Sequence, residues 1–181
     1  MRYITIIGSR ETTATNMARL QKAANLLVKF GYTLRSGGAD GADTVVTMMN
    51  CAKEIFIPWG NFNKMYHNPD KGIYDAQKFP NYRRAQMMAK KIHPAPDKLS
   101  RGALSLHTRN VYQVMGPSLS KAHYSRLVVY SANEVNGVVK GGTATAVHLA
   151  RKLNIPTVNV NIDKEFNEFL AKLMMALKNV K

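Results

Sequence analysis

Cysteine, acidic side chains and long apolar runs are all scarce in this chain of 181 residues. The single cysteine, Cys51, excludes an internal disulfide framework and a zinc site built on cysteines, and it is typical of a protein from a reducing cytosol. No run approaches the roughly 18–20 apolar residues that a membrane span needs, so we expect a cytoplasmic protein without a membrane partner. Because 45% of the residues are hydrophobic, which is enough for a core, we expect one domain over residues 1–181.

Asp and Glu number only 11 against 26 Lys and Arg, which gives a formal net charge of +15. Phosphates attract Lys and Arg over several ångströms, so this excess favours a polyanion as partner, although solubility alone can also explain it. The charge is concentrated between residues 62 and 126, where 12 Lys and Arg stand against three Asp and Glu. We therefore expect a basic insertion of helices and loops over residues 62–104.

Strand and helix patterns alternate on both sides of this insertion. Short β-branched and apolar runs predict strands, and apolar residues at steps of three and four predict helices. The pattern predicts strands at 3–7, 32–36, 54–57, 126–130 and 157–160, and helices at 17–28, 42–49, 143–153 and 165–178. Helical crossovers join parallel strands into an α/β fold, so we expect a Rossmann-like three-layer sandwich with a mostly parallel five-stranded sheet in the order 3-2-1-4-5.

Two further elements of the chain have weaker patterns. In the basic segment, residues 81–92 and 108–115 fit short helices, while residues 62–79 and 94–107 look like loops. In the last predicted helix we expect Met174 and Met175 to fill the core, because methionine packs adaptably.

Glycine- and hydroxyl-rich loops follow three of the predicted strands. Glycine lets the backbone approach a ligand, helix N-termini attract anions, and Ser, Thr and Arg side chains donate hydrogen bonds to phosphate. Taken singly, each loop fits a simple tight turn better, but all three would meet in one crevice where the strand order reverses. The spacing matches neither the GxGxxG fingerprint nor a Walker loop. The candidate nucleotide- or phosphate-binding residues of these loops are Gly8, Ser9, Arg10, Ser36, Gly37, Gly38, Ala39, Asp40, Gly41, Gly141, Gly142, Thr143 and Thr145.

The order of these motifs resembles the SLOG superfamily, which includes the DNA-processing protein DprA and the LOG-type nucleotide phosphoribohydrolases. The resemblance rests on Gly8-Ser9-Arg10, on Ser36-Gly37-Gly38-Ala39-Asp40-Gly41-Ala42-Asp43, on Arg109-Asn110 and on Gly141-Gly142-Thr143. It covers about residues 1–60 and 105–160 and implies a nucleotide-binding Rossmann-like fold and a homo-oligomer. It also implies that Arg109 and Asn110 reach the crevice. Asp43 fits a helix cap as well as a ligand-binding residue.

The position at which a catalytic carboxylate is expected carries a histidine. LOG-type hydrolases have the motif Pro-Gly-Gly-x-Gly-Thr-x-x-Glu, and His148 stands where its glutamate would be. A neutral imidazole does not stabilise a developing oxocarbenium ion as a carboxylate does, so the hydrolase hypothesis is weakened and catalytic residues stay unknown. Asp40 likewise stands where DprA-like proteins usually have a basic residue. The histidines are scattered, so we expect no metal site, and no cofactor beyond a nucleotide-type ligand.

These observations leave three functions open. The first is a protein that binds nucleotide phosphate in the crevice and single-stranded nucleic acid, such as single-stranded DNA, on its basic segment, without catalysis. The candidate nucleic-acid-binding residues are Arg83, Arg84, Lys90 and Lys91. The aromatics near them, suited either to stacking bases or to the core, are Tyr66, Tyr74, Phe79, Tyr82, Tyr112 and Tyr124. The second is a LOG-like nucleoside-monophosphate N-glycosidase, and the third is a sensor or sponge for a nucleotide signal.

Overall fold

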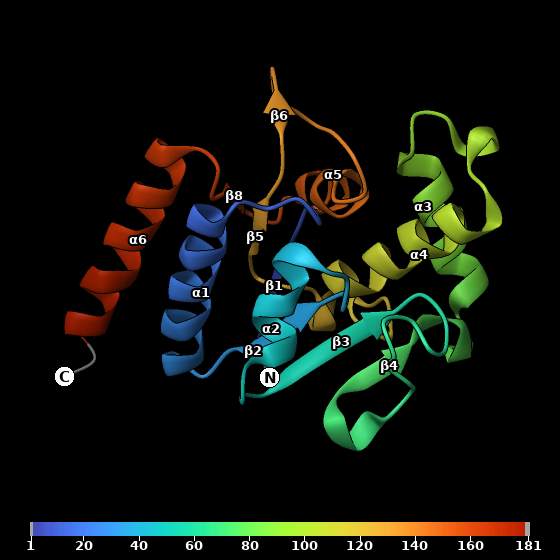
Figure 1. The fold of residues 1–181 in the computed structure, drawn as a ribbon, viewed down its shortest axis with the longest axis horizontal. Helices are drawn as coiled ribbons and strands as arrows, with labels where there is room; N and C mark the ends of the chain where they lie inside the picture. The colour runs from blue at the N-terminus through green and yellow to red at the C-terminus, as the bar shows by residue number, and fades with distance from the viewer. Residues whose placement is uncertain (1, 180–181) are drawn as a thin grey trace.

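A computed structural model describes residues 2–179 as an α/β fold around one parallel sheet (Figure 1). The six strands lie in the order β4-β3-β2-β1-β5-β8, and every neighbouring pair is parallel. Their bounds are β1 Tyr3–Gly8, β2 Thr33–Ser36, β3 Lys53–Ile57, β4 Ile73–Asp75, β5 Val128–Ser131 and β8 Thr157–Asn159. The predicted order 3-2-1-4-5 is confirmed for the five predicted strands, which are β3, β2, β1, β5 and β8.

The prediction of five strands is wrong by one, because β4 extends the sheet beyond β3. It lies in the stretch 62–79 that the sequence suggested to be loop, and Ile73 pairs with Ile55 of β3. Gly72, with φ of 69°, turns the chain into the strand, and its backbone lies against Lys53 too closely for a side chain. A strand of three residues is too short to show an alternating pattern, and only its pairing with β3 defines it.

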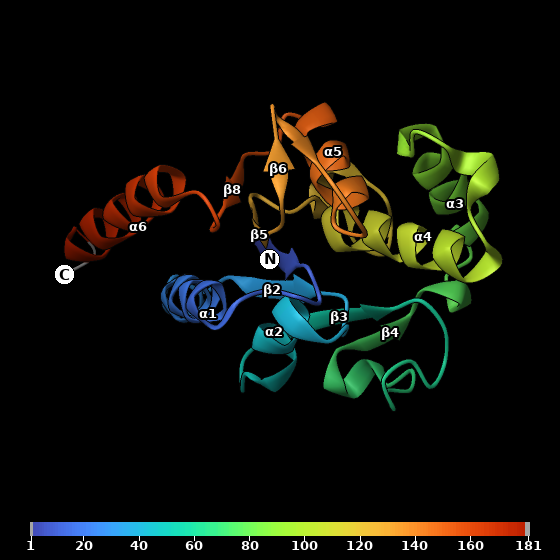
Figure 2. The ribbon, with the colours of Figure 1, turned by 45° about the horizontal axis from the view of Figure 1, so that its top comes forward.

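Helices cover both faces of the sheet, as a Rossmann-like three-layer arrangement requires (Figure 2). One apolar core lies between the sheet and the layer of α1, α2 and α6, and the other lies between the sheet and the layer of α3, α4 and α5. The bounds of the helices are α1 Ala14–Lys29, α2 Thr44–Met48, α3 Tyr82–Ile92, α4 Arg101–Met115, α5 Ala144–Lys152 and α6 Asp163–Lys178. A two-stranded hairpin of β6 Glu134–Val135 and β7 Val138–Val139 projects between β5 and α5.

The basic segment is packed into the fold more extensively than its sequence suggested. Helix α3 is where residues 81–92 predict it, but α4 begins at Arg101 and not at 108, because the Ser100 side chain accepts a hydrogen bond from the backbone N–H of Ala103 and caps the helix. The aromatic rings of Tyr74, Phe79 and Tyr112 pack on one another and on Phe56 of β3. These rings therefore hold the segment against the sheet.

The prediction for the two methionines of α6 is wrong. Met174 is 44% exposed and Met175 is 66% exposed, since α6 packs against α1 chiefly through its first half and the buried Phe166. Within residues 2–179, the helices are all too short or too polar to cross a membrane.

Candidate functional site

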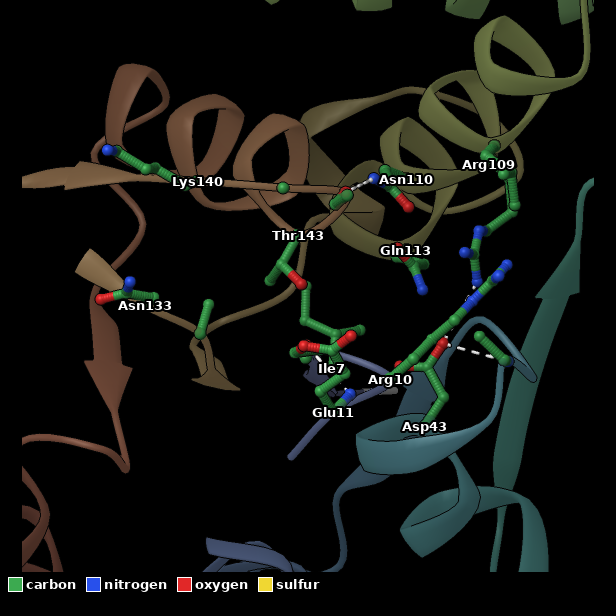
Figure 3. Close-up of a pocket in the computed structure, with 17 residues that line it drawn as sticks. Ile7, Arg10, Glu11, Asp43, Arg109, Asn110, Gln113, Asn133, Lys140 and Thr143 are labelled. Carbon is green, nitrogen blue, oxygen red and sulfur yellow. Dashed lines mark hydrogen bonds and ion pairs between the residues drawn. The ribbon is translucent and has the colours of Figure 1, made fainter. Parts of the chain in front are cut away.

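A crevice of about 490 Å³ lies between β1 and β5, where the strand order reverses, at the carboxyl ends of these strands (Figure 3). In open parallel sheets this is the usual place for a ligand. The loop after β1, the glycine loop after β2, helix α4 and the loop before α5 form its walls. Its lining residues are Ile7, Gly8, Ser9, Arg10, Glu11, Ala39, Asp43, Leu106, Arg109, Asn110, Gln113, Ala132, Asn133, Lys140, Gly141, Gly142 and Thr143.

Arg109 of α4 enters the crevice as a buried cation held by Asp43. Its Nη1 lies 3.2 Å from Oδ2 of Asp43, and the two side chains are 8% and 4% exposed. Asp43 Oδ2 also accepts a hydrogen bond from the backbone N–H of Ala39, at 3.2 Å, and makes no helix-capping bond. Burial raises the pKa of Asp43, and the charge of Arg109 opposes that rise. The sequence left a helix cap and a ligand-binding residue open for Asp43. In the structure Asp43 makes no cap, and its ion pair positions Arg109 in the crevice.

Gly37 provides the space that the Arg109 guanidinium occupies. A Cβ atom built at residue 37 would overlap Nη1 of Arg109 and would also crowd the amide of Gln113. The backbone of Gly37 itself has no left-handed φ that would require glycine. Its lack of a side chain is therefore explained by the close approach of α4 and not by a turn.

Three buried polar atoms of crevice-lining residues have no hydrogen-bond partner among residues 2–179, and one of them is Oδ1 of Asp43. The other two are Nε of Arg109 and Oε1 of Gln113, which lie one turn apart on α4. An unpaired buried donor costs about 1–3 kcal/mol, so a protein seldom keeps one without a use. All three side chains line the crevice, where a bound ligand can satisfy the donor of Arg109 and a donor group of a ligand can satisfy the two acceptors.

A second guanidinium, that of the exposed Arg10, points toward Arg109 (Figure 3). Burial lowers the pKa of Arg109, Asp43 counteracts this effect, and the charge of Arg10 lowers the pKa further. Lys140 adds a third cation at the rim, against the two carboxylates Asp43 and Glu11. The two guanidinium groups of Arg10 and Arg109 face each other and repel, so an anion bound between them is favoured.

The loop before α5 is fixed over the same space. The side-chain N–H of Asn110 donates a hydrogen bond to the carbonyl of Gly142, at 2.6 Å. This bond holds the loop of Gly141, Gly142 and Thr143 along the wall of the crevice, and Thr143 is buried there. Both residues of the pair Arg109-Asn110 thus line the crevice. Arg109 provides a cation, and Asn110 holds the loop before α5 through its hydrogen bond to Gly142.

Six of the residues predicted to bind nucleotide or phosphate do not line the crevice. They are Ser36, Gly37, Gly38, Asp40, Gly41 and Thr145. Gly38 and Gly41 have φ of 67° and 76°, and both are pressed against neighbouring chain, Gly38 by the side chain of Met65 and Gly41 by the backbone of Ser9 and Arg10. Thr145 shares a hydrogen bond with Nδ1 of His107, at 2.7 Å. These residues bring the loops together around the crevice.

Sequence reasoning did not single out Gln113, Asn133 and Lys140, which also line the crevice. Gln113 stands four residues after Arg109, and both fall within the helix predicted over residues 108–115, so the spacing already placed them on one face of that helix. Lys140 directly precedes Gly141. Asn133 had no signal, because the hairpin after β5 was not predicted.

The four basic candidates form a separate surface. Arg83 and Lys90, and likewise Arg84 and Lys91, are seven residues apart on α3, so they share one exposed face, while Ala85 and Ala89 pack inward. Of the six aromatics near them, only Tyr66 is strongly exposed, at 62%, and Tyr112 is fully buried. The sequence left base stacking and core packing open for these rings, and all of them except Tyr66 lie in the core or pack against it.

The groups that could catalyse a reaction are few. His148 is half-buried on α5 and does not line the crevice, whose carboxylates are Glu11 and the ion-paired Asp43. Within residues 2–179, the His, Cys, Asp and Glu side chains nowhere form a group of three that could hold a metal ion.

No protein family model and no curated protein sequence matches this chain. Among solved structures it is similar to DNA processing protein A from Helicobacter pylori, a structure that describes the single-stranded DNA binding mode of that protein. The sequence identity is 18%, the TM-score is 0.41, and the match covers 94% of this chain and 81% of the other. A likeness at this level leaves the function of the chain open.

Proposed function

We propose that the crevice binds a phosphate of a nucleotide unit, and that the physiological ligand is a single-stranded nucleic acid bound without catalysis. The observation that carries this proposal is the buried guanidinium of Arg109, whose Nε is unpaired and which faces a second guanidinium, that of Arg10. Arginine donates to phosphate oxygens in a fixed fork, and each such charged hydrogen bond is about twice as strong as a neutral one.

The distribution of charge supports a polymer over a lone nucleotide. The crevice itself holds three cations and two carboxylates, so it accounts for little of the net charge of +15. The exposed face of α3 carries four more cations with no acidic residue in that helix. A single-stranded nucleic acid offers a row of phosphates that can reach both places.

The N-glycosidase hypothesis has less support. Glycoside cleavage needs a free carboxylate beside the reacting carbon and usually a second one as its partner. Of the two carboxylates that line the crevice, Asp43 is ion-paired with Arg109, which leaves Glu11 alone. Sequestration of a small nucleotide signal uses the same residues as the main proposal, so only the choice of ligand separates the two.

The test is a titration of wild type and Arg10→Gln with fluorescent (dT)₁₂ and with thymidine monophosphate. Arg10 is exposed, so the substitution leaves the fold intact, and we expect about tenfold weaker binding of the oligonucleotide from the lost charged hydrogen bond. The matched control is Arg19→Gln, on α1 and outside the crevice lining, with unchanged affinity expected.

Three outcomes would contradict the proposal. Equal affinity of wild type and Arg10→Gln would remove the crevice from the binding site. Tight binding of the mononucleotide with no gain from the oligonucleotide would favour the sensor or sponge. Release of free base from a panel of nucleoside monophosphates, detected by chromatography, would favour the N-glycosidase.

A further inference from the structure

A second hollow, of about 330 Å³, lies near the first part of α4. It is lined by Trp59, Gln77, Arg101, Gly102 and Ser105. Trp59 is the only tryptophan of the chain and comes two residues after β3, in the connection between β3 and β4. The hollow thus combines a half-buried indole with an exposed guanidinium and an exposed amide, and none of these three side chains lines the crevice.

The hollow and the crevice share one face of α4. Gly102 lines the hollow and Arg109 lines the crevice, and seven residues separate them, which is close to two full turns. The two sites therefore follow one another along the helix, about 10 Å apart at 1.5 Å per residue. Between Gly102 and Arg109, Ser105 lines the hollow and the next residue, Leu106, lines the crevice.

Aromatic packing also connects the two sites. The Trp59 and Phe62 rings meet edge to face with centroids 5.3 Å apart, and the guanidinium carbon of Arg109 lies 6.0 Å from the centroid of Phe62. The side-chain N–H of Asn63 donates to the carbonyl of Gly38, at 3.0 Å, which ties this loop to the glycine loop. Trp59 is thus held in a fixed position relative to the cation that faces the crevice.

We propose that Trp59 stacks on a base of the strand whose phosphate occupies the crevice, so that the protein recognises at least two successive nucleotides. This inference rests on the proposed function. Every base has a flat π-face, and stacking on an aromatic ring adds affinity without selecting the sequence. Arg101 supplies a charge for a backbone phosphate beside the stacked base, and Gln77 an amide for its edge.

The single tryptophan is itself the probe for this site. We would titrate the protein with thymidine monophosphate and with 5′-phosphorylated (dT)₂, (dT)₄ and (dT)₈ and follow the intrinsic fluorescence of Trp59. We expect quenching by (dT)₂ and longer strands and little change with the mononucleotide. We also expect Trp59→Leu to weaken (dT)₈ binding about tenfold, measured by anisotropy, and Trp59→Phe to recover most of the loss.

Because Trp59 also packs on Phe62, a second variant guards against a defect in folding. Arg101→Gln changes an exposed side chain, and we expect it to weaken (dT)₈ binding while leaving thymidine monophosphate binding and thermal unfolding unchanged. If (dT)₈ binds without quenching Trp59, and neither Trp59→Leu nor Arg101→Gln changes its affinity, the stacking site is wrong although the crevice stands. If Arg10→Gln also leaves the affinity unchanged, the proposed function fails with it.

Discussion

Gly37 has no room for a side chain, and this decides how the crevice forms. The residue sits under the guanidinium of Arg109, which reaches it from α4, 72 positions later in the chain. Sequence reasoning assigned the glycines of this loop to phosphate binding, but the space at Gly37 is filled by the protein's own cation. The consequence for the ligand is indirect, since Gly37 sets where Arg109 lies.

Replacing Gly37 with alanine is therefore expected to displace Arg109 from Asp43. Overpacking of this kind costs about 1–3 kcal/mol of the free energy of unfolding, and we also expect oligonucleotide binding to weaken, because the cation leaves its position. Thermal unfolding and anisotropy measure the two effects. The control is Gly60→Ala, where a Cβ atom would meet only Asp75, at 3.7 Å. If Gly37→Ala changes neither the free energy of unfolding nor the affinity, the loop can shift to accommodate the methyl group and Gly37 does not set the position of Arg109.

His107 gives the stability of the protein a dependence on pH. Burial, and after it the charges of His93 and Arg109, lower its pKa from the ordinary 6.5 to about 4. Between these values the unfolded chain binds a proton that the folded protein does not. Stability contributed by the neutral imidazole is thus complete above about pH 6.5 and is lost as the pH falls toward 4.

We expect the melting temperature to fall over this pH range in wild type and to fall less in His107→Gln. Glutamine can keep the hydrogen bond to Thr145 but does not titrate. The comparison variant is His123→Gln, on an exposed turn, which should retain the wild-type slope. Parallel curves for wild type and His107→Gln would mean that other groups set the acid sensitivity.

Between neighbouring strands, one buried ion pair joins β2 to β3. Arg35 and Glu54 are partners in the sheet register, and Nε of Arg35 donates to Oε2 of Glu54 at 2.7 Å. The guanidinium is fully buried, with its carbon 3.6 Å from the centroid of the Tyr3 ring, and it also donates to the carbonyl of His123. This side chain therefore ties three separate parts of the chain to the end of β2.

Removal of Arg35 is expected to destabilise the protein by about 3–5 kcal/mol, because Glu54 is left charged and only 15% exposed. Denaturant unfolding of Arg35→Ala measures this. The control is Arg19→Ala, which breaks an ion pair of similar length, 2.6 Å, whose acidic partner Asp163 is 76% exposed. Its expected cost is about 1 kcal/mol. Equal costs for the two variants would show that burial does not decide the contribution of an ion pair here.

Across the molecule, basic residues lie on surfaces with different relations to the crevice. Helix α3 lies on the same side of the sheet as α4, and α6 lies beside α1 at the opposite end of the fold (Figure 1). Both helices carry exposed lysines, so net charge alone would make them equivalent. The proposed function distinguishes the two helices, because of α3 and α6 only α3 packs against α4, the helix that lines both the crevice and the hollow.

Removing four charges from α3 should accordingly reduce the salt dependence of binding. For Arg83→Gln, Arg84→Gln, Lys90→Gln and Lys91→Gln combined, we expect the slope of log affinity against log salt to fall by up to about 3, at about 0.7 per phosphate contact on a single strand. The control removes the same charge elsewhere, by Lys152→Gln, Lys164→Gln, Lys172→Gln and Lys178→Gln. Equal losses in the two variants would point to net charge and not to a surface on α3.

The sequence by itself determined the alternation of strands and helices, the order of five strands and the meeting of three loops, whereas the approach of Arg109 and Asn110 to those loops was implied only by the resemblance. Hydrophobic period and the topology of parallel sheets depend on local pattern and on chain order, which are both present in the sequence. Only the tertiary structure decided that β4 extends the sheet, that Tyr112 is buried while Met175 is exposed, and that Gly37 makes room for Arg109. Each of these depends on which distant residues come into contact, and no pattern of neighbours along the chain records that.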